Sequence, residues 1–206
     1  HFGSWEGIKN SRSRWQAYFT HKAFPEIPLD SQEGARLMQS IKIALNYGYA
    51  FRVALLKRIN DALPKGRAAF LWDGAHNSIV EEKFEGQSVI VHRQDAMRVF
   101  PGKPIMITGD RNTLGCIGIG SEGAAKTLWS ITPSATKVID KYIKTGKSQT
   151  ENPSHLTLVS KRKNSGMEKV EHMTSEGLFD VVDAFTKEDV MKPVAYIRPL
   201  GSIKGH

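Results

Sequence analysis

The stretch from residue 30 to residue 63 has apolar residues at the spacing of an α-helix. These residues are Leu37, Met38, Ile41, Leu45, Ala50, Val53, Ala54 and Leu55. Asp30 followed by Glu33 resembles a capping box, in which the first side chain accepts a hydrogen bond from the start of the helix. Pro64 and Gly66 favour an end to the helix, since proline cannot continue it and glycine is common at its terminus. The pattern predicts one long helix.

Beyond Gly66 the pattern changes to short runs rich in β-forming residues. The runs are RAAFLWD, SVIVHR, PIMITG and LGCIGIG, and the turn signals between them are FEGQ, FPGKP and GDRNT. Helical periodicity returns in SATKVIDKYIKTG, SEGLFDVVDAF and KEDVMKP, while TGKSQTENPSH resembles a linker. We therefore predict an α/β protein with a sheet in the middle of the chain and helices toward its C-terminal end.

Composition narrows the class of protein. With 206 residues and 40% hydrophobic content, the chain can bury a core of one domain, or two. Because no apolar stretch approaches about 20 residues and the first residues lack the apolar core of a signal peptide, we expect a cytoplasmic protein without a membrane span. The single cysteine, Cys116, excludes an internal disulfide, so a metal would need His, Asp or Glu ligands.

The chain is basic, with a formal charge of +8. Lysine and arginine collect in SRSRW, in LLKR and above all in SKRKNSGMEK, where Lys161, Arg162 and Lys163 are consecutive. Clustered positive charge favours a polyanionic partner such as RNA, because phosphates are attracted to it. A solvated, solubilising loop explains the same charges equally well. Charge alone leaves both interpretations open.

Motifs of known chemistry are weak when each is taken alone. The glycines of ITGDRNTLGCIGIG fit neither the Walker spacing nor the dinucleotide fingerprint, so turn and strand glycines are the simpler interpretation. No helical i, i+4 pair exists among His76, His92, His155 and His172. The GxSxG elbow of serine hydrolases is also missing. These features indicate only a basic α/β protein.

The order of several motifs is more specific than any one of them. AHN is followed by VHRQDAMRVFPG, ITGDRNTLGCIGIGSEGA, a turn rich in Ser and Thr, and the terminal VAYIRPLGSIKG. This order resembles the C-terminal portion of the RtcB-type RNA ligases, the tRNA-splicing ligases, which typically carry AHN, HRKGA.RAFP, PGSMG, HGAGR and RPLGVVKG. HFGSWEG is similar to their HSGSRG, so the resemblance covers almost the whole chain, whereas the family's opening half, with its Asp/Cys and Asn-His metal motifs, is absent.

The resemblance implies a fold, a reaction and site residues. It implies a single RtcB-like domain over residues 1–206 with a mixed sheet, a long helix and C-terminal helices. The family reaction is the joining of an RNA 3′-phosphate or 2′,3′-cyclic phosphate to a 5′-hydroxyl end with GTP and Mn²⁺, in tRNA splicing and RNA repair. By the same resemblance His1 and His76 are manganese ligands, while Asn77 and Lys204 hold the nucleotide. We expect His76 at the end of a strand, facing a concave polar site.

Departures from the family pattern concern the chemistry itself. The histidine of HGAGR, which becomes covalently bonded to GMP, is replaced by Pro133. The lysine and glycine of HRKGA have become Gln94 and Asp95, and the serine of PGSMG has become Asp110. A carboxylate there would repel a phosphate by roughly 1 to 4 kcal/mol. We therefore expect a copy that does not guanylylate itself, and we assign no catalytic residue.

Three other functions remain open at this stage. The first is an active ligase whose missing half and nucleophile come from a second chain or another segment. Because no initiator methionine precedes His1, we also expect the sequence to be a fragment, a processed product or part of a longer chain. The second is a non-catalytic RNA-binding or structural component that retains the fold. The third is an unrelated metal-dependent phosphoesterase. The RNA-binding interpretation predicts that Lys161 to Lys163 lie on the surface and add to RNA affinity.

Overall fold

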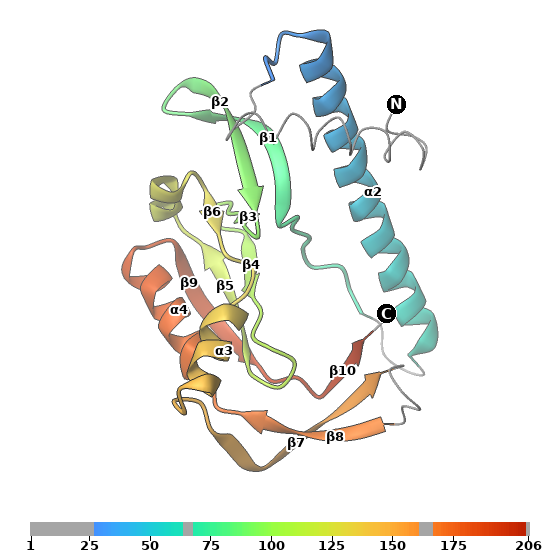
Figure 1. Cartoon of the computed structure of the whole chain (residues 1–206), viewed down its shortest axis with the longest axis vertical. Coiled ribbons are helices and arrows are strands. Elements are labelled where there is room, and N and C mark those ends of the chain that lie inside the picture. The colour runs from blue at the N-terminus through green and yellow to red at the C-terminus, as the bar shows by residue number, and fades with distance from the viewer. Residues whose placement is uncertain (1–26, 64–67, 161–166, 205–206) are drawn as a thin grey trace. The chain divides into compact units, whose positions relative to one another are not determined.

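The fold is described from a computed structural model, which covers residues 27–63, 68–160 and 167–204 (Figure 1). The chain divides into two compact units, residues 1–68 and residues 69–206, and we describe each by itself. In the described residues no helix is long and apolar enough to cross a membrane. The expectation of a single domain over residues 1–206 stays a prediction.

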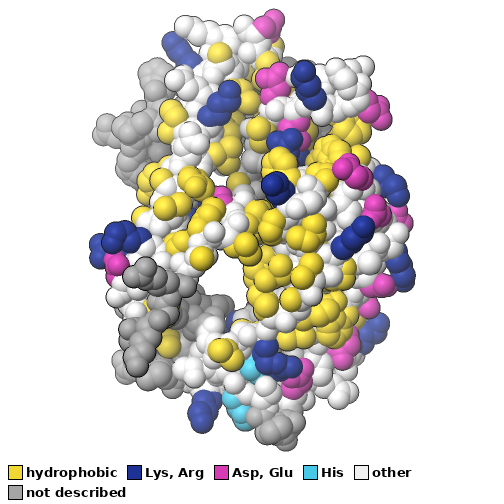
Figure 2. Space-filling view, turned by 180° about the vertical axis from the view of Figure 1, so that it is seen from behind, with side chains coloured by type: hydrophobic (Ala, Val, Ile, Leu, Met, Phe, Trp, Pro, Cys, Tyr) yellow, Lys and Arg dark blue, Asp and Glu magenta, His cyan; other side chains and the backbone are white. Residues whose placement is uncertain are grey.

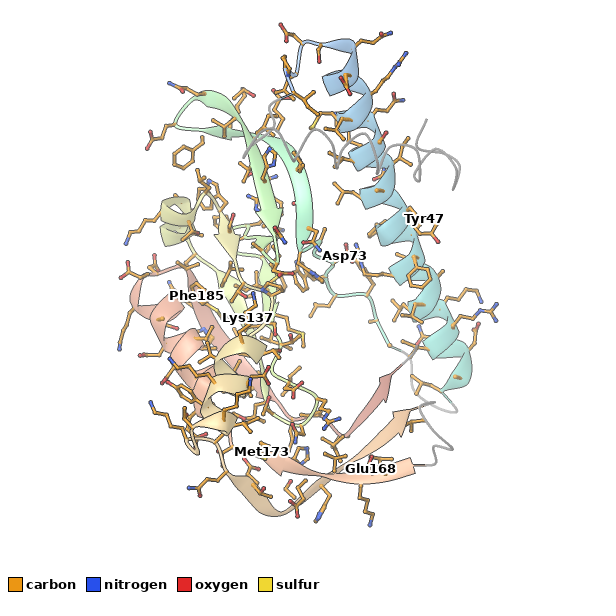
Figure 3. All side chains as sticks on the ribbon, viewed as in Figure 1. Tyr47, Asp73, Lys137, Glu168, Met173 and Phe185 are labelled. Carbon is orange, nitrogen blue, oxygen red and sulfur yellow. The ribbon has the colours of Figure 1, made fainter. Side chains whose placement is uncertain are left out.

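The described part of the first unit is dominated by the helix α2 (Gln32–Ala62), so the predicted long helix is confirmed. Its N-terminal cap is Ser31, whose hydroxyl accepts a hydrogen bond from the Gly34 N–H at 3.0 Å. The capping box expected at Asp30 was therefore wrong by one residue, because the hydroxyl three residues before Gly34 takes the role. Tyr47, labelled in Figure 3, stacks on Phe51 one turn later in the helix.

Within the described residues, the strands of the second unit form four small sheets rather than one mixed sheet. Three of the sheets are purely antiparallel. They are β1 (Asn77–Phe84) with β2 (Gln87–Gln94), β3 (Met97–Arg98) with β6 (Ser130–Ile131), and β4 (Pro104–Ile107) with β5 (Gly115–Gly120) and β9 (Met191–Ile197).

The fourth sheet is mixed. Its central strand β7 (Thr150–Ser160) pairs antiparallel with β8 (Met167–Met173) and parallel with β10 (Gly201–Lys204). The single mixed sheet that the resemblance implied is thus confined to these three strands within the described residues. The coarser prediction, a mixed α/β protein, is confirmed.

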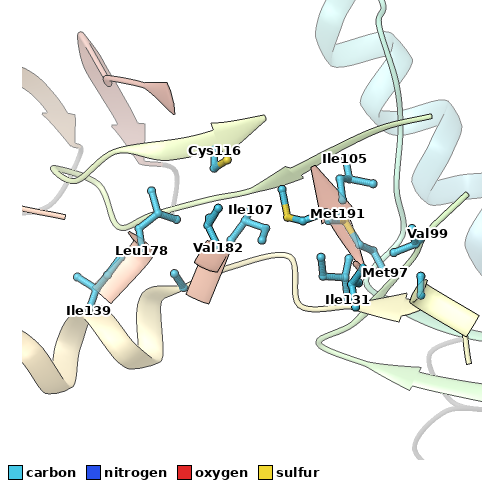
Figure 4. Close-up of a cluster of buried hydrophobic side chains, with 13 residues drawn as sticks. Met97, Val99, Ile105, Ile107, Cys116, Ile131, Ile139, Leu178, Val182 and Met191 are labelled. Atoms are coloured by element: carbon cyan, nitrogen blue, oxygen red, sulfur yellow. The ribbon is translucent and has the colours of Figure 1, made fainter. Parts of the chain in front are cut away.

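Two helices and a short 3-10 helix complete the second unit: α3 (Thr136–Lys144), α4 (Glu176–Lys187) and η1 (Glu122–Thr127). Apolar side chains of α3 and α4 pack on one face of the sheet β4-β5-β9 (Figure 4). The buried cluster includes Ile105, Ile107, Cys116, Ile139, Leu178, Val182 and Met191. Burial also raises the pKa of the Cys116 thiol. This packed face anchors the loops described below.

The opposite face of the same sheet carries apolar side chains at the surface. Figure 2 shows them gathered on the side turned away from α3 and α4. Val194 is 66% exposed and Ile197 is 37% exposed, while their neighbours Met106 and Ile117 are half-buried. The sheet therefore has one face in the core and one apolar face in contact with solvent.

The strands expected in SVIVHR, PIMITG and LGCIGIG are confirmed, as are the helices expected in SATKVIDKYIKTG and SEGLFDVVDAF. No strand forms over residues 68–73 of the run RAAFLWD. There the side chain of Asn60 bonds both backbone groups of Ala68, at 2.5 and 2.9 Å, in place of a strand partner. That strand prediction was wrong.

Two further expectations were also wrong. KEDVMKP is not a helix: α4 ends at Lys187, Asp189 has a left-handed backbone with φ of 53°, and β9 begins at Met191. Burial of Val190 and Met191 in the core favours the strand there. The linker-like TGKSQTENPSH contains the start of β7 at Thr150. A strand with polar residues is stable there because β8 pairs with it at Thr150, Glu151 and His155.

Candidate functional site

The β1–β2 hairpin brings two of the singled-out motifs together. Its turn, Glu85–Gly86, has positive φ at both residues, as a two-residue turn that matches the strand twist requires. The resulting register places Asn77 opposite Gln94. Asn77 Oδ1 accepts a hydrogen bond from the Asp95 N–H at 3.1 Å, and the Ala96 N–H donates to the His76 carbonyl at 3.0 Å. We call these four residues, His76, Asn77, Asp95 and Ala96, the hairpin base.

His76 lies immediately before β1 rather than at the end of a strand, so that part of the prediction was wrong. The apolar run before it forms no strand, and the chain enters the sheet only at Asn77. Both side chains are exposed, which means that the His76 ring is not packed in an apolar core. The expectation that it faces a concave polar site stays a prediction.

By the resemblance, Asp95 stands where the HRKGA motif has its glycine. The backbone conformation of Asp95 gives a reason for glycine at that position. Its φ is 50°, in the left-handed region, where a Cβ atom is unfavourable and glycine is not. Aspartate tolerates this region better than most residues. The turn therefore keeps its shape at some conformational cost, while the motif's lysine is replaced by the exposed Gln94.

A buried ion pair fixes the hairpin to the rest of the second unit. Arg93 forms a two-pronged contact with Glu82 at 2.6 and 2.9 Å, and both side chains are at most 2% exposed. Arg93 also donates to the Ser130 hydroxyl and the Leu128 carbonyl, each at 2.9 Å. Sequence reasoning missed this pair. Its signal was a charged residue at a core-facing position in each of two facing strands.

The second half of the site consists of two loops held backbone to backbone. The Thr108 N–H donates to the Pro133 carbonyl at 2.9 Å, and the Ala135 N–H donates to the Thr108 carbonyl at 2.8 Å. A Cβ atom on Gly109 would collide with the Leu114 carbonyl and the Thr113 hydroxyl. Residues 108–113 and 132–136, which we call the loop pair, therefore lie side by side.

The side chains of the loop pair do not form an activated nucleophile. Pro133 offers only a carbonyl, which already accepts from Thr108. The Ser134 hydroxyl lies 2.6 Å from the Thr136 hydroxyl, and the Thr132 hydroxyl donates to the Ser134 carbonyl at 2.9 Å. Across the described residues, neither Thr132 nor Ser134 is hydrogen-bonded to a carboxylate or an imidazole. A serine or threonine nucleophile needs such a base.

Asp110 is half-buried in the same loop. Its backbone N–H donates to the Thr113 hydroxyl at 2.7 Å, and Thr113 is itself buried. The turn thus holds the carboxylate of Asp110 on the loop that follows Thr108. This position adds negative charge to the part of the site where the motif has a serine.

His172 has a structural position. It is 2% exposed, its Nε2 lies 2.9 Å from the Pro199 carbonyl, and its Nδ1 lies 2.7 Å from the Ser154 hydroxyl. Because a carbonyl only accepts, Nε2 donates to Pro199, and in the neutral ring Nδ1 accepts from Ser154. Arg198 binds Glu151 beside them. The terminal RPLG segment is therefore fixed to β7 and β8.

Several predicted residues lie beyond what the structure describes. His1 and Lys161 to Lys163 are outside the described residues, and of Lys204 only the backbone, paired in β10, is described. Residues 27–63, 68–160 and 167–204 contain no group of three His, Cys, Asp or Glu that could hold a metal ion. The described residues therefore do not complete a manganese site, and the pairing of His76 with His1 stays a prediction.

Comparison with known proteins gives a consistent result. A family model described as tRNA-splicing ligase RtcB matches residues 5–205. The chain is 27% identical over 211 residues to the tRNA-splicing ligase RtcB of Pyrococcus horikoshii, covering 87% of this chain and 24% of that protein. Over 230 residues it is 21% identical to the protein of the same name from Methanococcus maripaludis, covering 96% and 48%.

A third relative, the tRNA-splicing ligase RtcB of Pyrococcus furiosus, is 25% identical over 219 residues, covering 87% of this chain and 22% of that protein. The chain therefore spans about a quarter of the length of the two Pyrococcus proteins and about half that of the Methanococcus protein. The match extends through both the hairpin base and the loop pair.

Proposed function

Because the chain belongs to the tRNA-splicing ligase RtcB family, we propose that it binds RNA ends and a guanine nucleotide but does not form the covalent GMP adduct of the family reaction. The family reaction joins an RNA 3′-phosphate or 2′,3′-cyclic phosphate to a 5′-hydroxyl end. In the proposal this chain retains binding functions of that reaction and lacks its nucleophile.

The observation that carries the proposal is the surroundings of Pro133. The loop pair holds residue 133 against Thr108 through the backbone carbonyl of Pro133, a contact that does not depend on the side chain at this position. Proline has no side-chain nucleophile. Of the neighbouring hydroxyls, that of Thr132 donates to the Ser134 carbonyl, and that of Ser134 is hydrogen-bonded to the Thr136 hydroxyl. The negative charge of Asp110 on the facing loop further opposes a phosphate.

Nucleotide binding is supported by the hairpin base. The Asn77 amide is oriented by its hydrogen bond from Asp95 and remains exposed, so its Nδ2 group is available to a ligand. Lys204 lies in β10 and is proposed to recognise the base. These groups hold a ligand without reacting with it, which is why binding can outlast the loss of guanylylation.

No step of the proposed mechanism depends on manganese. His76 is a single histidine donor, and the described residues offer no second and third ligand beside it. A metal ion bound by His76 and His1 would offset phosphate charge. The steps assigned to this chain are the orientation of Asn77 by Asp95 and the placement of the loop pair.

A non-catalytic RNA-binding component is the second candidate function. It is favoured by the same replacement of the nucleophile together with the formal charge of +8. This candidate differs from the first in predicting RNA binding with no affinity for GTP. RNA as a partner is common to both.

Incubation with labelled GTP and Mn²⁺ tests the first proposal. We expect no covalent GMP after denaturation, but reversible GTP binding that weakens several-fold in Asn77→Ala. The matched control is Gln87→Ala, at the other end of the hairpin, which should leave the affinity unchanged. Pro133→His alone should not restore ligation, because Asp110 remains.

The outcomes separate the candidates. A mass increase by GMP that survives denaturation would show that the chain has a nucleophile elsewhere and is a working ligase. RNA binding without any GTP binding would favour the second candidate. Ligation only after addition of a second polypeptide would show that the nucleophile is supplied by a partner.

A further inference from the structure

The helix α3 has three lysines on one face. Lys137, Lys141 and Lys144 follow the i, i+4, i+7 spacing, which at 100° per residue puts them within about 60° of one another. All three are exposed, whereas Ile139 on the opposite face is fully buried in the core. We call these residues the α3 lysine row. Lys137, labelled in Figure 3, begins it.

The lysine row is not neutralised by the protein. Two other exposed lysines of the second unit do pair with carboxylates, Lys126 with Glu188 at 3.2 Å and Lys187 with Asp183 at 2.6 Å. In the part of the chain that the structure describes, no ion pair involves any of the three row lysines. Their positive charge therefore faces solvent.

The acidic groups beside the row are few. On α4, the Asp180 carboxylate accepts a hydrogen bond from the Tyr142 hydroxyl, which raises the pKa of Tyr142. The helix α3 itself carries the acidic residue Asp140, and the three row lysines outweigh its negative charge. Just beyond the helix, Lys147 lies 4.6 Å from the centre of the Tyr142 ring and extends the positive surface.

The row starts at the candidate site. α3 begins at Thr136, which is the last residue of the loop pair, and at 1.5 Å per residue the row runs for about 10 Å along the helix. Like charges at i, i+3 and i, i+4 cost a helix a few tenths of a kcal/mol per pair. A ligand with regularly spaced negative charges would reverse that cost.

We propose that the α3 lysine row binds the phosphate backbone of single-stranded RNA and leads it toward the loop pair. The inference rests on the proposed RNA binding of this chain. A membrane surface fits less well, because a helix that lies on a membrane needs an outward apolar face, and the apolar face of α3 is in the core.

The test compares two triple variants that remove the same charge. Lys137→Gln, Lys141→Gln and Lys144→Gln together remove the row, and Lys83→Gln, Lys103→Gln and Lys192→Gln remove three exposed lysines from other elements. The probe is a single-stranded RNA oligonucleotide with a 5′-hydroxyl end, and its affinity is measured against salt concentration. Glutamine is a good helix former, so α3 should persist, which circular dichroism checks.

The expected result is a change in salt dependence. Each phosphate contact contributes about 0.7 to the slope of log affinity against log salt, so the loss of three contacts lowers the slope by about 2. From about 50 to about 200 mM salt, the unmodified chain should then lose about twentyfold more affinity than the row variant. The control variant should keep the slope of the unmodified chain. The variant with Lys137→Arg, Lys141→Arg and Lys144→Arg should also keep the slope of the unmodified chain, because arginine retains the positive charge.

Other outcomes overturn the proposal. If the row variant and the control variant bind RNA equally, the row is only a solvated face, while the proposed RNA binding of the chain stands. If the unmodified chain binds no RNA at any salt concentration, both proposals fail. Row-dependent binding to vesicles of anionic phospholipid without an effect on RNA affinity would replace RNA by a membrane as the partner. Detection of covalent GMP would overturn the proposed function alone.

Discussion

The hairpin base and the loop pair carry the candidate site residues of the second unit, and each joins segments that are far apart in the sequence. Asn77 and Asp95 are separated by 18 residues, and Thr108 and Pro133 by 25. Both regions are held largely by backbone N–H and C=O groups, which every residue but proline supplies in full. At the hairpin base a side chain also contributes, because Asn77 accepts from the Asp95 N–H. At the loop pair, residue 133 is held through its carbonyl alone.

This difference separates the position of a segment from its chemistry. A backbone hydrogen bond to the carbonyl of residue 133 is the same for histidine and for proline. If residue 133 is the position of the family's nucleophile, as we propose, proline removes the reactive side chain, whereas the contact with Thr108 requires only a carbonyl. The following predictions test how far each region depends on side chains, from the largest expected effect to the smallest.

Glu82→Gln should lower the free energy of unfolding by about 3–5 kcal/mol, because it leaves the buried Arg93 guanidinium without its counter-charge. Urea denaturation measures the effect. The matched control is Glu81→Gln, at the neighbouring exposed position, which should change stability by less than about 0.5 kcal/mol. Equal effects of the two variants would show that the ion pair does not anchor the hairpin base.

Gly109→Ala should cost about 1–3 kcal/mol, since its Cβ would collide with the Leu114 carbonyl and the Thr113 hydroxyl. Gly48→Ala in α2 is the control, because its Cβ meets only the flexible end of Arg52 and should gain up to about 1 kcal/mol of helix stability. Thermal unfolding compares the stability of the Gly109→Ala and Gly48→Ala variants with that of the unmodified chain. A Gly109→Ala protein as stable as the unmodified chain would mean that the loop pair is not closely packed.

Asn77→Ala should cost about 1 kcal/mol by leaving the Asp95 N–H without its acceptor. The direct measurement is hydrogen exchange at the Asp95 amide, which should become faster. Asn77→Asp keeps an oxygen acceptor at this position and should preserve the protection. Unchanged exchange in Asn77→Ala would show that Asp95 does not orient the Asn77 side chain.

Asp95→Gly should raise stability by up to about 1 kcal/mol, because glycine adopts a φ of 50° without the Cβ penalty. The same substitution at Asp140, inside α3, should instead cost about 0.5 kcal/mol. Urea denaturation of both variants compares them. A loss of stability in Asp95→Gly would indicate that the Asp95 side chain has a contact that outweighs its backbone conformation.

Local features were predictable from the sequence because their causes are local. The helix α2 follows from its apolar spacing and stops before Pro64, and the FEGQ turn needs only that Glu85 and Gly86 accept positive φ. The order of motifs likewise identified the family without any structure. The proposal that Pro133 stands at the position of the family's nucleophile also comes from the sequence.

What only the tertiary structure decided depends on partners that are remote in sequence. The first half of β7 is polar and resembles a linker, yet it is a strand because β8 supplies its hydrogen bonds, whereas the described residues 68–73 of the apolar run form no strand. The buried pairing of Glu82 with Arg93 and the burial of His172 against Pro199 depend on packing in the same way. A residue's own chemistry determines the turn or helix it favours, but hydrogen-bond partners and burial come from the rest of the chain.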